Sequence, residues 1–138
     1  MKAMGYLLIL GLALTAQACA PAPAAALDAE GLAEALRTAG AEVEAGEAVE
    51  QAFFSVPGAI IRVNGQDVQV FEYADAAARQ AESDVISPDG STIGTTMVTW
   101  IDRPNFWARD RLIVLYVGTD AAIMELRTDV LAEPMTER

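Results

Sequence analysis

The chain has 138 residues, enough for one domain and too few for several. It carries 9 basic and 20 acidic side chains, a net charge of −11, which excludes nucleic acid and a basic membrane-binding face. Histidine is absent and cysteine occurs once, so histidine-based triads, His/Cys zinc sites and intramolecular disulfides are excluded too. We therefore expect no metal, no cofactor and no catalytic residue of these types. The fold must be held together by its apolar core.

The N-terminus has the layout of a secretory signal peptide. A short positive start, Met1-Lys2, precedes an apolar run over residues 6–14, and small residues then lead to Cys19. The apolar run is too short to cross a bilayer of about 30 Å. This pattern predicts export of the chain from the cytoplasm.

With Cys19 directly after Ala18, the segment resembles the lipobox of bacterial lipoproteins. In that family the cysteine is acylated and the signal is removed just before it, so the resemblance implies lipidation of Cys19. Leucine is usual in the family where this chain has Ala16, and Ala16-Gln17-Ala18 also fits cleavage for plain secretion. The resemblance implies a lipid-anchored protein of the bacterial cell envelope. It would lie on the outer membrane facing the periplasm if the host has two membranes, and otherwise on the outer face of the cytoplasmic membrane.

Three segments follow from these boundaries. Residues 1–18 are the predicted signal peptide, 19–26 the lipid anchor with an Ala/Pro tether, and 27–138 a single α+β domain. Proline in the tether fixes φ and disfavours helix and sheet, so the tether would hold the domain slightly away from the lipid.

Three helices are predicted, each with an aspartate near its start, and Asp28 and Asp120 are expected to cap the first and the third by accepting hydrogen bonds from free backbone N–H groups. They cover residues 28–40, 74–86 and 120–134. In the first, Leu32 and Leu36 share one face and Gly40 ends the helix. In the third, the apolar side is assigned to Ile123, Leu126 and Val130.

Asn64-Gly65 lies between two alternating apolar runs, which is the pattern of a two-residue β-hairpin. This turn predicts that Arg62 faces Asp67 and Ile61 faces Val68. Further strands are expected at residues 42–44, 51–56, 95–101 and 111–117. The order α-β-β-β-α-β-β-α predicts one antiparallel sheet of four to five strands with helices on one face, leaving the other face to solvent or to a ligand.

Residues 102–110 are predicted to form a long loop between the last two strands. The loop contains the adjacent aromatics Phe106 and Trp107, flanked by Arg103 and Arg109. Neighbouring side chains on an extended chain point in opposite directions, so we expect one ring to be partly exposed. Aromatic and arginine side chains are enriched at interface hot spots, which makes these four residues the candidate binding site. The alternative is that both rings cover a sheet edge.

The run from Phe54 to Gly118 also resembles small bacterial envelope lipoproteins of GC-rich hosts, a likeness that implies no activity. The sequence contains no nucleophile motif, which favours a non-catalytic binding or interaction module. Its expected partners are the bilayer, through the anchor, and an envelope protein or a glycan. Two alternatives stay open: a carboxylate-dependent, glycan-acting enzyme, and a small-ligand-binding lipoprotein.

Overall fold

The computed structural model describes residues 26–136, so the predicted signal peptide and Cys19 lie outside the described residues. The elements in chain order are α1 (Ala29–Thr38), β1 (Val43–Val49), β2 (Gly58–Val63), β3 (Gln66–Glu72), α2 (Ala76–Ser83), β4 (Thr92–Ile93), β5 (Thr96–Met97), β6 (Pro104–Arg109), β7 (Leu112–Val117) and α3 (Ala121–Leu131). Five strands form one antiparallel sheet in the order β1-β2-β3-β7-β6, and β4 pairs with β5 in a small separate hairpin. The predicted α+β class and element order are confirmed.

The hairpin between β2 and β3 has the predicted register. Arg62 pairs with Asp67 and Ile61 pairs with Val68 across the two strands. Asn64 and Gly65 both have positive φ, at 51° and 79°, as a two-residue turn of this type requires.

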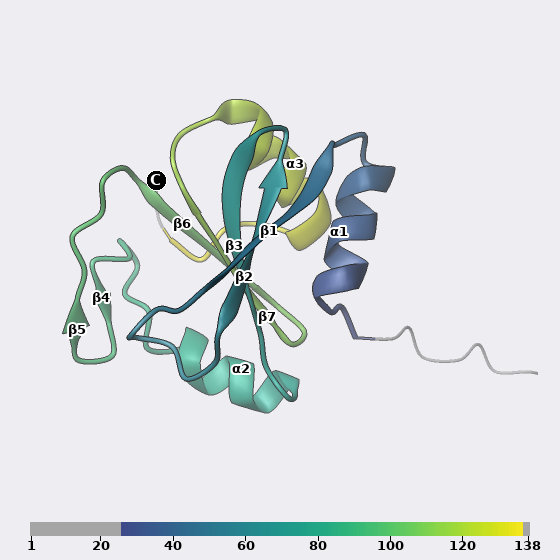
Figure 1. Ribbon diagram of the computed structural model, residues 1–138. Helices are drawn as coiled ribbons and strands as arrows, with labels where there is room; N and C mark the ends of the chain where they lie inside the picture. The colour runs from purple at the N-terminus through teal and green to yellow at the C-terminus, as the bar shows by residue number, and fades with distance from the viewer. Residues whose placement is uncertain (1–25, 137–138) are drawn as a thin grey trace, which may run out of the picture.

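Helices α1 and α3 contact each other and cover one face of the sheet (Figure 1). Asp28 caps α1 by accepting from the Gly31 N–H at 2.7 Å, and Gly40, with φ of 97°, ends it. Leu32 and Leu36 are buried against this face, as predicted. The core here is made by Val63, Val68, Val70, Trp107, Leu112, Val114, Tyr116, Ile123 and Leu131 together with the two leucines.

The opposite face of the sheet is covered as well, contrary to the expectation that it would be left to solvent or a ligand. The loop over residues 50–57 places Phe54 on Phe71, with ring centroids 4.7 Å apart. The segment between α2 and β6 adds Trp100, whose ring lies 5.8 Å from that of Phe106. These aromatic residues form a second core on this face, together with Tyr73, Ile93, Ile113 and Leu115.

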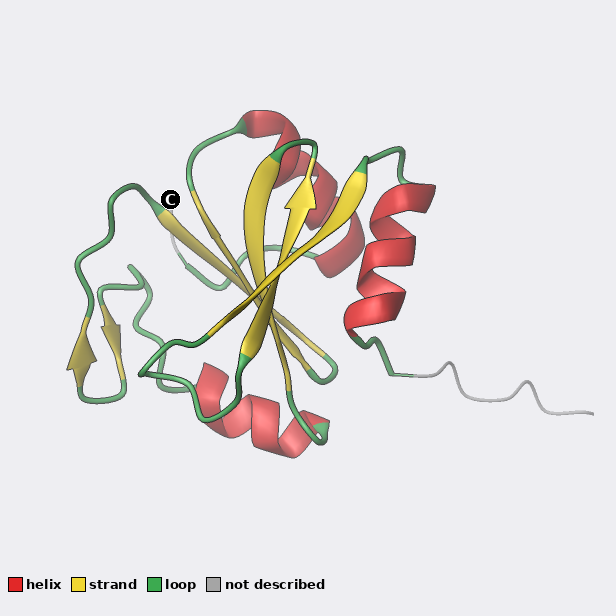
Figure 2. Cartoon of the chain, viewed as in Figure 1, coloured by secondary structure: helices red, strands yellow, loops and turns green. Residues whose placement is uncertain are grey.

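The predicted loop over residues 102–110 is wrong, because most of it is strand β6. It pairs with β7 through a tight turn in which Asp110 has φ of 49°. The predicted strand over 95–101 is correspondingly wrong. That stretch contains only the short β5 and an irregular run, which project to the side of the sheet with β4 (Figure 2). The strand expected at 51–56 is a series of turns.

Strand β6 lies at an edge of the sheet, and the C-terminal segment covers that edge. The Met135 N–H donates to the Phe106 carbonyl at 2.7 Å. Thr136 Oγ1 accepts from the Phe106 N–H at 3.3 Å and donates to the Pro104 carbonyl at 3.2 Å. These bonds satisfy backbone groups that an open edge would offer to another chain.

Candidate functional site

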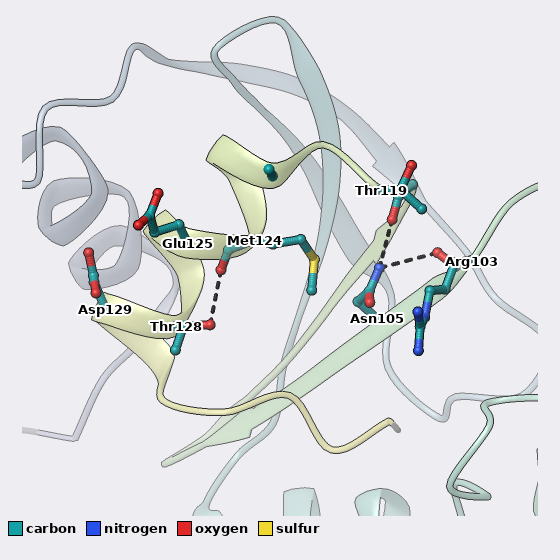
Figure 3. Close-up of a pocket in the computed structure, with 9 residues that line it drawn as sticks. Arg103, Asn105, Thr119, Met124, Glu125, Thr128 and Asp129 are labelled. Atoms are coloured by element: carbon teal, nitrogen blue, oxygen red, sulfur yellow. Dashed lines mark hydrogen bonds between the residues drawn. The ribbon is translucent and has the colours of Figure 1, made fainter. Parts of the chain in front are cut away.

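A groove of about 530 Å³ lies between α3 and the ends of β6 and β7 (Figure 3). This volume falls within the range typical of small-molecule sites. One wall is α3 and the other is the strand end with the connection into α3. The lining residues are Arg103, Asn105, Gly118, Thr119, Ala121, Met124, Glu125, Thr128 and Asp129.

Asn105 fixes the strand side of the groove. Its side chain is buried, and its amide nitrogen lies within hydrogen-bond distance of the carbonyls of Arg103, Tyr116 and Gly118, at 3.2, 3.3 and 2.9 Å. These hydrogen bonds connect the end of the β6–β7 pair to the segment that leads into α3. Met124 extends from the helix toward Asn105 and closes the inner side of the groove (Figure 3).

The connection from β7 to α3 requires glycine at position 118. A Cβ there would lie 2.6 Å from the Tyr116 hydroxyl oxygen and 2.7 Å from its Cζ, distances that real contacts do not reach. The same hydroxyl accepts from the Asp120 N–H at 3.3 Å, and the Asp120 carboxylate caps α3 by accepting from Ile123 at 3.0 Å. The tyrosine thereby positions the start of α3.

Arg127 adjoins the groove-lining Thr128 in α3 and lies on the side of the helix that faces the sheet. Its side chain is fully buried, and its guanidinium carbon is 5.3 Å from the Trp107 ring centroid and 5.5 Å from that of Tyr116. Within residues 26–136, none of its three side-chain nitrogens has a hydrogen-bond partner. Burial lowers the pKa of Arg127 to about 9, with Tyr116 opposing the shift, so the side chain keeps its charge at neutral pH.

The Trp107 indole N–H is a second buried hydrogen-bond donor next to Arg127. It is buried and unpartnered among the described residues, although its ring is packed against the guanidinium. An unsatisfied buried donor costs about 1–3 kcal/mol, and a buried charge without a partner costs more. The layer between α3 and the sheet therefore contains a cluster of hydrogen-bond donors that lacks an acceptor among residues 26–136.

The four candidate binding residues of the sequence analysis are not brought together as an exposed site. Phe106 and Trp107 are both fully buried, on opposite faces of the sheet, so the expectation of an exposed ring is wrong. Arg103 lines the groove, whereas Arg109 is exposed and donates to a carbonyl in the last turn of α3. Cys19 lies outside the described residues and its lipidation stays a prediction.

Sequence reasoning missed Arg127, although the pattern of α3 contains a signal. Ile123, Arg127 and Leu131 follow one another at four-residue intervals and form the buried stripe of the helix. A charged residue in the middle of such a stripe is unusual enough to single out. The groove itself has no sequence signal, because its walls come from segments that only the fold brings together.

Within residues 26–136 no three acidic side chains are grouped closely enough to hold a metal ion. In the same part of the chain, no helix is both long and apolar enough to cross a bilayer. The chain matches no protein-family model, no curated protein and no solved structure. What the fold and the groove define is a class: an α+β domain with a small-molecule-sized groove between one helix and the end of its sheet.

Proposed function

We propose that the protein is a lipid-anchored envelope lipoprotein whose folded domain is a non-catalytic module that binds a small ligand in the groove beside α3. The observation that carries the binding function is the groove itself, with a buried amide at its floor and a flexible methionine on its inner wall. The lipobox-like segment ending at Cys19 supports the anchoring. Of the alternatives raised by the sequence, small-ligand binding gains most from this geometry.

A carboxylate-dependent enzyme is a second candidate, favoured by one feature of the same site. Glu125 and Asp129 lie one turn apart on α3 and both line the groove. Glycosidic hydrolysis uses two such groups on either side of the scissile bond. In this chain both come from one helix and project from its outer side, which favours binding over hydrolysis (Figure 3).

Ligand screening by NMR tests the proposal on the purified full chain. The probes are a panel of free amino acids, short alanine peptides and disaccharides, and the readout is the amide shifts of Thr119, Ala121 and Thr128. We expect at least one class of probe to shift these signals.

The matched variants are Ala121→Trp, which fills the groove, and Ala122→Trp, which places the same ring on the neighbouring exposed position outside it. Only the first is expected to abolish the response. If no probe moves the groove signals, or if both variants behave alike, the groove is not the binding site.

A further inference from the structure

We propose that Arg127 and Trp107 form an internal receptor for the carboxylate of a small zwitterionic ligand that enters through the α3 groove. The inference rests on the proposed function, because it assigns the chemical class of the ligand for the same groove.

The first argument is the chemistry of the unpartnered groups. Arg127 presents N–H donors on all three nitrogens, Trp107 presents one more, and neither residue can accept a hydrogen bond. A ligand that completes this cluster must therefore supply acceptor oxygens. A carboxylate supplies two in one plane and matches the fork of a guanidinium, and charge-assisted pairs of this kind are the strongest hydrogen bonds available.

The second argument is the energetic cost of Arg127 at this position. The residues one turn before and after it on the buried stripe are Ile123 and Leu131. A third aliphatic side chain would continue the stripe, whereas a buried, unpartnered charge opposes folding. The two rings offset part of this cost by cation–π attraction but satisfy no N–H group. A ligand that binds only the folded state would offset the remainder.

The third argument is access. Met124 and Thr128 flank Arg127 in α3, and both line the groove. Tyr116, whose ring lies against the guanidinium, is the cross-strand partner of Asn105 on the groove floor. Residues that line the groove thus adjoin Arg127 along α3 and adjoin Tyr116 across the β6–β7 pair, and they form the layer through which a ligand would have to pass. Met124 is the movable part of that layer, since its unbranched side chain rotates about three bonds.

The fourth argument concerns the overall charge of the ligand. The protein has a net charge of −11, and the groove is lined by the two carboxylates of Glu125 and Asp129 against the one cation of Arg103. A simple anion is repelled on approach, whereas a ligand that also carries a cationic group is not. The expected ligand therefore places its carboxylate inward and its positive group toward the rim, as an amino acid or short peptide does.

Calorimetric titration with three forms of trialanine tests this arrangement: the unblocked peptide, its C-terminal amide and its N-acetyl derivative. We expect the unblocked peptide to bind at least about tenfold more tightly than the amide, because the amide removes the carboxylate. The N-acetyl form should bind more weakly than the unblocked peptide, and the difference should shrink at high salt.

Variants assign the effect to Arg127. Arg127→Met should abolish the preference for the free carboxylate, while Arg62→Met, at an exposed position on β2, should leave it intact. Trp107→Phe keeps an aromatic ring beside the guanidinium but removes the indole N–H, so it should reduce the preference severalfold. Cooperative thermal melting shows that each variant is folded. If Arg127→Met does not fold, Arg127→Lys keeps the charge without the paired donors and should lose most of the preference.

Equal affinity for the unblocked peptide and the amide would overturn the inference, as would a preference that survives in the folded Arg127 variant. Absence of binding by the unblocked peptide would overturn it as well. If the unblocked peptide does not bind but a disaccharide or another probe still shifts the groove signals, the proposed binding function holds and the ligand belongs to a different class.

Discussion

The Tyr73 hydroxyl is a single polar group that joins the sheet to α2. The residue is buried, and its hydroxyl donates to the Glu82 carboxylate at 2.6 Å. Burial, and then the hydrogen bond and charge of Glu82, raise the pKa of Tyr73 above its ordinary value of about 10. The folded state therefore favours the protonated phenol more strongly than the unfolded chain does.

Because the folded-state pKa of Tyr73 is raised, its contribution to stability is fully present below about pH 10 and is lost as the pH rises further. We expect Tyr73→Phe to lower the free energy of unfolding by about 1.5–3 kcal/mol at pH 8, since a hydrogen bond to a charged group is lost. The variant should also lose less stability than the natural chain between pH 9 and 11. Chemical denaturation at both ends of this range measures the effect. Parallel losses in the two proteins would contradict the assignment.

At the scale of elements, the connection between β7 and α3 sets the width of the groove. Gly118 lies in this connection, lines the groove and leaves no space for a Cβ beside the Tyr116 ring. The position of α3 relative to the end of β7 therefore depends on how closely the backbone at Gly118 approaches the Tyr116 ring.

Helix α2 is held in place by polar contacts. Arg79 Nε donates to the Asp110 carbonyl at 2.9 Å, while Ala78 and Ala81 are exposed.

Gly118→Ala should displace the connection and destabilise the domain, and Gly65→Ala is its matched control. Gly65 also has a positive φ, at 79°, but nothing lies within 4 Å of a Cβ built there. The control thus measures backbone strain alone, typically about 1 kcal/mol. We expect Gly118→Ala to cost about 1–3 kcal/mol more, because the clash adds to the strain. Equal free energies of unfolding for the two variants would show that Tyr116 moves away freely.

Among the elements, aspartate caps and the Asn-Gly turn were predictable because they act between near neighbours in the chain. Asp28 and Asp120 cap α1 and α3 as expected, and Asp75, which was expected only near the start of α2, caps that helix too. Helix α2 differs from the other two, because its alanines face solvent and the helix is held by contacts of Arg79 and Glu82. The periodic pattern along a helix carries no information about side-chain contacts with segments that are distant in the chain.

At the scale of the whole molecule, the prediction that matters most for localisation lies at Cys19, ahead of the first described residue. The chain has a net charge of −11, which disfavours binding to anionic lipid, so membrane retention should depend on acylation. The C-terminal segment, in turn, protects the β6 edge from pairing with other chains.

Cys19→Ala should abolish incorporation of labelled fatty acid, and leave the protein either as a released, folded domain or as an unprocessed precursor. The natural chain should partition into the detergent phase after labelling. Plain secretion predicts the opposite result: an unlabelled natural chain in the aqueous phase, with no difference between it and the variant. That outcome would replace the lipoprotein assignment by the alternative cleavage at Ala16-Gln17-Ala18.

By itself the sequence determined the α+β class, the helix starts and the β2–β3 register, because these follow from local hydrogen bonding and from alternation along neighbouring strands. Only the tertiary structure decided that Phe106 and Trp107 are buried on opposite faces of β6 and that Arg127 lies between Trp107 and Tyr116. It also decided where the groove lies. The physical reason is that burial and side-chain partnership depend on segments brought together from distant positions in the chain, and a local pattern does not specify which segments those are.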